Sequence, residues 1–305
     1  MAKLEELKRK AEALMPGTGA CPGCGTTLAI THIAEVIVGE LGKKLVLVIP
    51  ASCWTINTGK WPSYTGHGTV TTYLALFSSA APEAAGIADA CALKGYTDTV
   101  VMPVCGDGAT FDIGFGDVSA AAERNDNILY VVRDNEAYMN TGIQKSGATP
   151  FGAYTTTTPH AARHTGKKKD IDQIMASHDI PYLATAALGS VALLKDFREK
   201  VKKAAQKTGF RFLHILDPCP PGWKFTADKT VEIARLAVAS RVFPILEYEN
   251  GIWRITHRPK KPASVKEYLS LQGRFANMTD AEIQEVERQT NERYAMFERL
   301  CQKSS

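Results

Sequence analysis

The stretch TVVMPVCGDG, residues 99–108, decides the fold class. Its apolar and mostly β-branched residues predict a buried strand that ends at a Gly-Asp-Gly turn. A second apolar run, ILYVV at residues 128–132, is likewise followed by polar residues. Further strands are predicted at residues 45–49 and 210–216, and helices at residues 4–14, 27–41, 75–94, 118–123, 171–177, 191–206 and 282–300. Strands that alternate with helices indicate an α/β fold, in which helices flank a parallel sheet.

Polar residues stand where the two quoted strands end. Ligands bind at the carboxyl ends of strands in parallel sheets, and glycines let a diphosphate approach the main chain closely. Asp107 can supply a carboxylate to Mg²⁺, Asn135 an amide oxygen and the main chain of Ala137 a carbonyl oxygen. A Gly-Asp-Gly triplet also occurs in ordinary turns. It is Asn135, after the second strand, that favours a diphosphate and magnesium site.

Four of the seven cysteines stand in loop contexts. Cys21 and Cys24 form a C-x-x-C pair in a glycine-rich turn, a spacing that lets two thiolates bind one metal centre. Cys53 and Cys219 each follow an apolar strand, so both can meet at one edge of a parallel sheet. Four thiolates suit either a [4Fe–4S] cluster or a structural Zn²⁺, whereas a redox dithiol is disfavoured by the two distant partners. The cysteines expected to be inert are Cys91, Cys105 and Cys301.

The composition excludes several classes of protein. The net charge is only +4 over 305 residues, which argues against a nucleic-acid-binding protein. The basic run at residues 166–169 is expected to be a solvated loop. Residues 1–15 lack the apolar core of a signal peptide, and no segment has the roughly 18–20 apolar residues of a membrane span. We expect a cytoplasmic protein of one domain, residues 1–305, with a cysteine-rich turn near its N-terminus and a helical extension at its C-terminus.

Four segments resemble the β subunits of 2-oxoacid:ferredoxin oxidoreductases. They are CPGCG at residues 21–25, GDGATFDIG at 106–114, DNEAYMNTG at 134–142 and PCPPGW at 218–223. The likeness spans nearly the whole chain, and it implies a thiamine-diphosphate-binding fold with Mg²⁺ as a second cofactor. The residues it implies for cofactor binding are Gly106, Asp107, Gly108, Ala109, Thr110, Asn135, Ala137, Tyr138, Asn140 and Thr141, with Asp107, Asn135 and Ala137 on Mg²⁺.

The same resemblance implies an iron–sulfur centre and partner subunits. Cys21, Cys24, Cys53 and Cys219 would hold a [4Fe–4S] cluster, which disfavours zinc. A partner α subunit would supply the glutamate that activates thiamine, a γ or δ subunit would carry ferredoxin-like clusters, and ferredoxin would accept the electrons. The expected reaction is oxidative decarboxylation of a 2-oxoacid. Two alternatives stay open: an electron-transfer module without catalysis, and a zinc-bearing thiamine decarboxylase.

One segment departs from the family pattern and bears on the substrate. Residues 61–70 are polar and glycine-rich where many family members carry an apolar stretch, and they include Tyr64, His67 and Thr69. The second carboxylate of oxalate needs such donors, whereas the methyl group of pyruvate needs an apolar wall. The segment therefore favours oxalate, converted to CO₂ without coenzyme A. The alternative is pyruvate, converted with coenzyme A to acetyl-CoA and CO₂.

Three residues are candidates for direct roles in catalysis. By the resemblance, Asn140 faces cofactor or substrate. Phe111 and Asp112 follow the Gly-Asp-Gly turn and are predicted to lie over the thiazolium. There Asp112 would disfavour a neighbouring carboxylate by like-charge repulsion and so promote loss of CO₂. The alternative is that Asp112 is a helix-start residue stabilised by the helix dipole.

Overall fold

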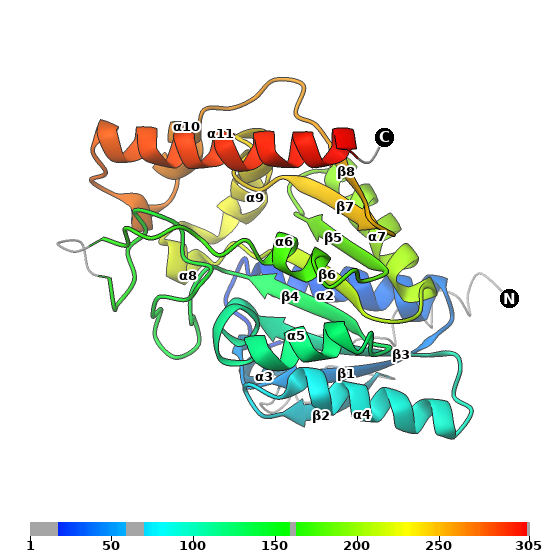
Figure 1. Cartoon of the computed structure of the whole chain (residues 1–305). Coiled ribbons are helices and arrows are strands. Elements are labelled where there is room, and N and C mark those ends of the chain that lie inside the picture. The colour runs from blue at the N-terminus through cyan, green and yellow to red at the C-terminus, as the bar shows by residue number, and fades with distance from the viewer. Residues whose placement is uncertain (1–17, 59–69, 159–162, 304–305) are drawn as a thin grey trace, which may run out of the picture.

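The computed structural model describes residues 18–58, 70–158 and 163–303. Within these ranges the chain forms a sheet of eight strands in the order β2-β1-β3-β4-β6-β5-β7-β8, with helices on both faces (Figure 1). From β2 to β5 in that order the neighbours pair in parallel, and the last two pairings are antiparallel. The predicted α/β fold is confirmed. The expectation of a wholly parallel sheet is wrong for β7 and β8, which run antiparallel to their neighbours. These two strands are joined by a two-residue turn, and only antiparallel strands permit so short a connection.

Helices and strands alternate along most of the described chain. The strands are β1 (Lys44–Pro50), β2 (Thr71–Ala75), β3 (Thr99–Gly106), β4 (Leu129–Asp134), β5 (Tyr182–Ala186), β6 (Arg211–Leu216), β7 (Ile245–Glu249) and β8 (Ile252–His257). The α-helices are α2 (Gly25–Ala34), α3 (Cys53–Thr58), α4 (Ala80–Leu93), α5 (Phe115–Glu123), α6 (Ile171–Ala176), α7 (Val191–Gln206), α8 (Pro220–Trp223), α9 (Thr230–Ala239), α10 (Val265–Ser270) and α11 (Asp280–Lys303). Two π-helical segments, η1 (Glu35–Glu40) and η3 (Gly108–Ile113), continue α2 and lead into α5.

Several boundaries differ from those expected. Cys53 begins the short helix α3 rather than lying in a loop, and the helix expected at residues 75–94 begins only at Ala80. Ala75 instead ends the edge strand β2. The short strands β5, β7 and β8 are not indicated by the sequence, because runs of five or six residues without clear alternation carry little signal. The helix expected at residues 4–14 lies outside the described residues.

The central strands are buried on both faces. All residues of β4 and β6 are buried, as expected for runs without alternating polar residues. α2 and α7 cover one face of the sheet through residues such as Ile30 and Phe197. α4, α5 and α6 cover the other face, where Phe297 of α11 joins the same core cluster. The C-terminal helix is therefore anchored on the sheet, with its charged side outward.

The carboxyl ends of β1, β3, β4 and β6 lie at one edge of the sheet, since these strands are parallel. The residues that closely follow these ends include Cys53, Asp107, Asn135 and Cys219. The polar and cysteine-containing segments predicted to carry chemistry therefore meet at this edge.

Candidate functional site

Two cavities adjoin at this edge of the sheet. The first, named the Asp107 cavity, is lined by Ala51, Ser52, Cys53, Phe77, Gly106, Asp107, Gly108, Ala109, Arg133, Asn135, Ala137, Tyr138, Met139, Asn140 and Thr141. The second, named the cysteine cavity, has a volume of about 390 Å³ and contains Cys21, Cys24, Cys53 and Cys219 in its lining, with Thr26 and Asp217. Cys53, Asn135, Met139 and Asn140 line both cavities.

The Asp107 cavity gathers nearly all residues predicted to bind the cofactor. Among them, Thr110 stands apart: it is fully buried and its hydroxyl donates to the carbonyl oxygen of Gly106 at 2.9 Å. Its place is under the glycine turn rather than in the cavity wall. Asn140 lines the cavity, and its role toward cofactor or substrate stays a prediction.

Phe111 and Asp112 lie outside that lining. Phe111 is fully buried, with its ring edge-on to His214. Asp112 accepts a hydrogen bond from the main-chain N–H of Gly147 at 2.8 Å and lies 3.7 Å from the ammonium group of Lys169. The catalytic roles suggested for these two residues stay predictions.

Three oxygen-bearing groups meet in the Asp107 cavity. One terminal atom of the Asn135 amide lies 3.0 Å from Asp107 Oδ1 and 2.9 Å from the carbonyl oxygen of Ala137. An amide nitrogen in that place donates to both. An amide oxygen there would face two other acceptors, and a cation between them would offset their repulsion. With Mg–O bonds of roughly 2.1 Å, adjacent ligands of an octahedral Mg²⁺ are about 3 Å apart, so the Asn135 amide has the spacing of an adjacent ligand to both Asp107 and Ala137.

The carboxyl group of Asp107 is buried beside another acid. Ser146 Oγ donates to its Oδ2 at 2.5 Å. Burial, together with the negative charge of Asp134, raises the pKa of Asp107 well above its usual value. A bound cation would offset this cost and favour the ionised form.

Gly108 leaves room for the ring of Tyr138. A Cβ atom at residue 108 would lie 2.5 Å from Tyr138 Cε1, and the Tyr138 hydroxyl donates to the carbonyl oxygen of Gly108 at 3.3 Å. Burial and the nearby Asp112 carboxylate raise the pKa of Tyr138 to about 12. The hydroxyl therefore stays protonated at neutral pH.

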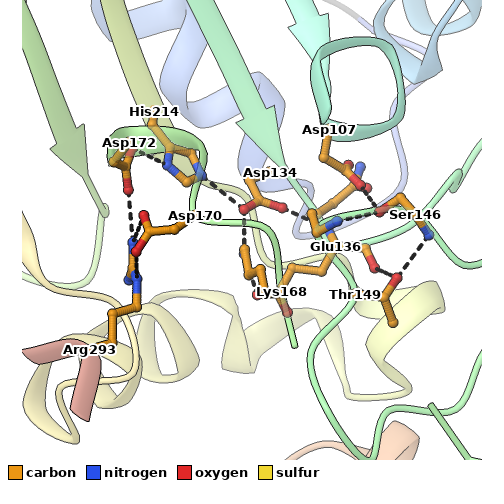
Figure 2. A network of polar contacts seen from close by, with 12 residues as sticks. Asp107, Asp134, Glu136, Ser146, Thr149, Lys168, Asp170, Asp172, His214 and Arg293 are labelled. Atoms are coloured by element: carbon orange, nitrogen blue, oxygen red, sulfur yellow. Dashed lines mark hydrogen bonds and ion pairs between the residues drawn. The ribbon is translucent and has the colours of Figure 1, made fainter. Parts of the chain in front are cut away.

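A buried charge network supports the turn that carries Asn135 (Figure 2). His214 lies between two carboxylates, with Nε2 2.9 Å from Asp134 Oδ2 and Nδ1 2.8 Å from Asp172 Oδ1. Although burial opposes protonation, these carboxylates raise the pKa of His214 to about 9. Arg293 of α11 donates to Asp172 at 2.9 Å. The network thus links the end of β4 to the C-terminal helix.

The same network holds Glu136 in a left-handed conformation, with φ of 64°. Its carboxylate accepts from Arg274 at 2.6 Å and from Lys168 at 2.8 Å, and Lys168 also pairs with Asp134. The prediction that residues 166–169 form a solvated loop is wrong for Lys168, because two buried carboxylates require a cation beside them. Holding Glu136 in this way directs its neighbours on both sides into the Asp107 cavity.

The four predicted cysteines reach one cavity from three segments of the chain. Cys24 directly precedes α2, Cys53 begins α3 and Cys219 directly precedes α8, while the N–H of Cys24 donates to the carbonyl oxygen of Cys21 at 3.1 Å. Burial raises the pKa of Cys53 to about 11, with the positive charge of Arg133 acting in the opposite direction. Burial also raises the pKa of Cys24 and of Cys219. These thiols would ionise only beside a strong positive charge such as a metal centre.

Within the described ranges, no group of three or more His, Cys, Asp or Glu side chains is placed to hold a single metal ion. The cysteines expected to be inert do not line the cysteine cavity: Cys105 is fully buried in β3, and Cys91 and Cys301 are half-buried in helices.

A buried triad between the cavities is not among the residues predicted from the sequence. Arg133 of β4 is 1% exposed and lines the Asp107 cavity. Its Nη1 donates to Thr26 Oγ1 at 2.8 Å and lies 3.7 Å from Asp217 Oδ2, and Thr26 in turn donates to Asp217. The sequence feature that could have indicated this triad is an arginine at the end of an apolar strand. An arginine there is expected to be buried, and a buried charge needs partners.

Comparison with known proteins agrees with this arrangement. Residues 52–215 match the family described as thiamine pyrophosphate enzyme, C-terminal TPP binding domain. The chain is 42% identical to the ketoisovalerate oxidoreductase subunit VorB of Pyrococcus abyssi, with 98% of each chain covered. The chain belongs to the β subunits of 2-oxoacid:ferredoxin oxidoreductases. The resemblance carried by the four sequence segments is thereby confirmed.

This β subunit has further relatives at the same level. It is 40% identical to the pyruvate synthase subunit PorB of Methanocaldococcus jannaschii, over 92% of this chain and 95% of that protein. Its fold is similar to that of a 2-oxoglutarate:ferredoxin oxidoreductase from Magnetococcus marinus, with a TM-score of 0.58, 24% identity, and coverage of 75% of this chain and 80% of that chain. The β subunit is thus part of an oxidoreductase of several subunits.

Two expectations from the sequence remain, one on the segment that bears on oxalate and one on the absence of a membrane span. Tyr64, His67 and Thr69, which favour oxalate, lie outside the described residues. In the part of the β subunit that the structure describes, no helix combines the length and apolar character needed to cross a bilayer.

Proposed function

We propose that this β subunit binds thiamine diphosphate and Mg²⁺ in the Asp107 cavity and a [4Fe–4S] cluster in the cysteine cavity. With its partner subunits it carries out the oxidative decarboxylation of a small 2-oxoacid. The observation that carries this proposal is the meeting of the Asp107 carboxylate, the Asn135 amide and the Ala137 carbonyl in a cavity that shares Cys53 with the four-cysteine cavity. When bound, thiamine diphosphate supplies an electron sink for decarboxylation and the cluster accepts electrons singly.

The residues of the chain would bind the cofactors and orient them toward the substrate. Asp107, Asn135 and the Ala137 carbonyl hold Mg²⁺ through their oxygen atoms. Gly106 and Gly108 let the diphosphate approach the main chain. Asn140 stands in the wall shared by the two cavities and would face cofactor or substrate.

The partner subunits complete the site. We propose that an α subunit supplies the glutamate that activates the cofactor, since a match to one thiamine-binding domain accounts for only part of such a site. A γ or δ subunit with ferredoxin-like clusters would carry electrons on to ferredoxin. The enzyme would act in the cytoplasm.

For the substrate, a small aliphatic 2-oxoacid such as pyruvate, with coenzyme A as acceptor of the acyl group, has the better support. Apolar side chains of Ala51, Phe77 and Met139 line the Asp107 cavity and offer a wall to an alkyl group. The relatives reported above are named for ketoisovalerate and for pyruvate. Oxalate is the second candidate, and it rests on the polar segment at residues 61–70.

The test is anaerobic dye reduction by the complex purified with its natural partners. We expect reduction with pyruvate or 2-ketoisovalerate plus coenzyme A, and stoichiometric thiamine diphosphate, iron and acid-labile sulfide. Reduction by oxalate alone, without coenzyme A, would replace the aliphatic substrate by oxalate. Zinc in place of iron and sulfide would identify a decarboxylase without redox function. A cluster without thiamine diphosphate would identify an electron-transfer module.

A further inference from the structure

Arg133 places a positive charge between the two cavities. It lies near the end of β4, in register with Gly106 on β3 and with Ile215 on β6. The side chain lines the Asp107 cavity, while the two side chains it contacts, Thr26 and Asp217, line the cysteine cavity. The guanidinium group thus stands where these cavities adjoin.

Stability alone does not account for an arginine here. A buried ion pair adds little net stability compared with apolar side chains of similar volume. In addition, Nε of Arg133 is buried and finds no hydrogen-bond acceptor among the described residues. A buried donor without an acceptor costs free energy, so an arginine at position 133 lowers the stability of the folded chain.

The surrounding residues are shaped to keep this group in place. Asp217 lies so close to the start of α2 that a Cβ on Gly25 would be 2.5 Å from its Oδ1. Thr26 donates to that carboxylate and accepts from Arg133 Nη1. The cation and its counter-ion are therefore fixed directly beside the C-x-x-C turn.

We infer that Arg133 sets the reduction potential of the cluster that the cysteine cavity would hold, with Asp217 as the opposing charge. The inference rests on the proposed function. In the step concerned, one electron leaves the decarboxylated substrate unit, which is oxidised, and enters the cluster, which is reduced. No bond breaks and no proton moves, so the cluster becomes more negative by one unit. A fixed guanidinium favours that reduced form, because net charge and hydrogen bonding around a cluster tune its potential.

The charge and the structural role of Arg133 can be separated by a set of variants. Arg133→Gln removes the charge, whereas Arg133→Lys keeps it. Asp217→Asn removes the opposing charge. Arg211→Gln is the matched control, because Arg211 is likewise buried in a central strand, with 3% of it exposed, but lies at the opposite end. It pairs with Leu129 of β4, four residues before Arg133, or roughly 13 Å along the strand.

The measurement is an anaerobic redox titration of the whole complex, followed by electron paramagnetic resonance. The relevant signal is the one that Cys219→Ser removes. We expect Arg133→Gln to lower the reduced-to-oxidised ratio at a given potential about tenfold, which is about 59 mV for a one-electron couple. Asp217→Asn should shift the ratio in the opposite direction. Arg133→Lys and Arg211→Gln should stay near the wild type.

Equal potentials in Arg133→Gln and wild type would overturn the inference, as would equal shifts in the Gln and Lys variants. If Arg133→Gln fails to assemble, Asp217→Asn decides alone, and an unchanged potential there also overturns it. The proposed function fails differently: wild-type complex without iron and without the signal overturns both proposals together.

Discussion

Replacing Gly108 by alanine should weaken thiamine diphosphate binding by filling the space that the Tyr138 ring occupies. The new Cβ would lie 2.5 Å from Tyr138 Cε1 and 2.6 Å from Cδ1, where ordinary contact begins at 3.4 Å. The ring must therefore move by about 0.9 Å, and Tyr138 lines the Asp107 cavity. Gly108 does not have a left-handed φ, so the backbone itself tolerates alanine and the effect is steric.

Overpacking of this kind costs about 1–3 kcal/mol, which corresponds to a dissociation constant raised roughly 5- to 150-fold. The assay is a calorimetric titration of the cofactor-depleted complex with thiamine diphosphate at saturating Mg²⁺. Gly116→Ala is the control, since a Cβ at Gly116 in α5 meets no atom within 4 Å.

A second variant tests the cause. Adding Tyr138→Ala to Gly108→Ala removes the ring that the new Cβ meets, so the double variant should bind the cofactor more tightly than Gly108→Ala. The steric reasoning is refuted if Gly108→Ala binds as tightly as the control, or if removal of the ring brings no recovery.

Three further predictions concern the charges and thiols of the site. The pKa of His214 is raised to about 9 from 6.5. Its protonation therefore contributes about 3 kcal/mol to the free energy of unfolding below pH 6.5, and this contribution is lost as the pH rises to 9. The apparent melting temperature should fall over that range, and it should fall much less in His214→Gln. Asp107→Asn should stabilise the cofactor-free complex, because it removes a buried carboxylate beside Asp134, yet it should weaken Mg²⁺-dependent cofactor binding at least about tenfold; thermal shift with and without cofactor checks both signs, and equal signs would contradict the assignment. Cys53→Ser should lower the iron and sulfide content of the complex, whereas Cys105→Ser should leave both unchanged; equal loss in the two variants would count against the cysteine cavity.

The buried network shows why the cofactor turn is rigid before any ligand binds. Glu136 is held in a left-handed conformation by ion pairs to Arg274 and Lys168. Such conformations cost about 1–3 kcal/mol and persist only when the surroundings determine them. The polar groups of Asn135 and Ala137 are therefore positioned by the protein and would need little rearrangement to bind the proposed Mg²⁺.

Much of the site could be predicted from the sequence, because its parts follow strands. Mainly apolar runs indicate β1, β3, β4 and β6, and parallel strands bring their carboxyl ends to the same end of the sheet. The residues after those ends, among them Asp107, Asn135 and Cys219, were therefore expected to lie close together, and the structure places them so. The family could be recognised for the same reason, since its motifs are short and local.

The edge hairpin β7–β8 and the buried charges were decided by the tertiary structure. His214 bonds to Asp134, 80 residues away, and to Asp172, 42 residues away. Arg133 reaches Thr26 across 107 residues. Strands and glycine turns depend on residues that are close together in the sequence, so they can be predicted from the sequence. A charge inside the protein is tolerated only where a partner from another segment faces it, and that meeting exists only once the strands have taken their places in the sheet.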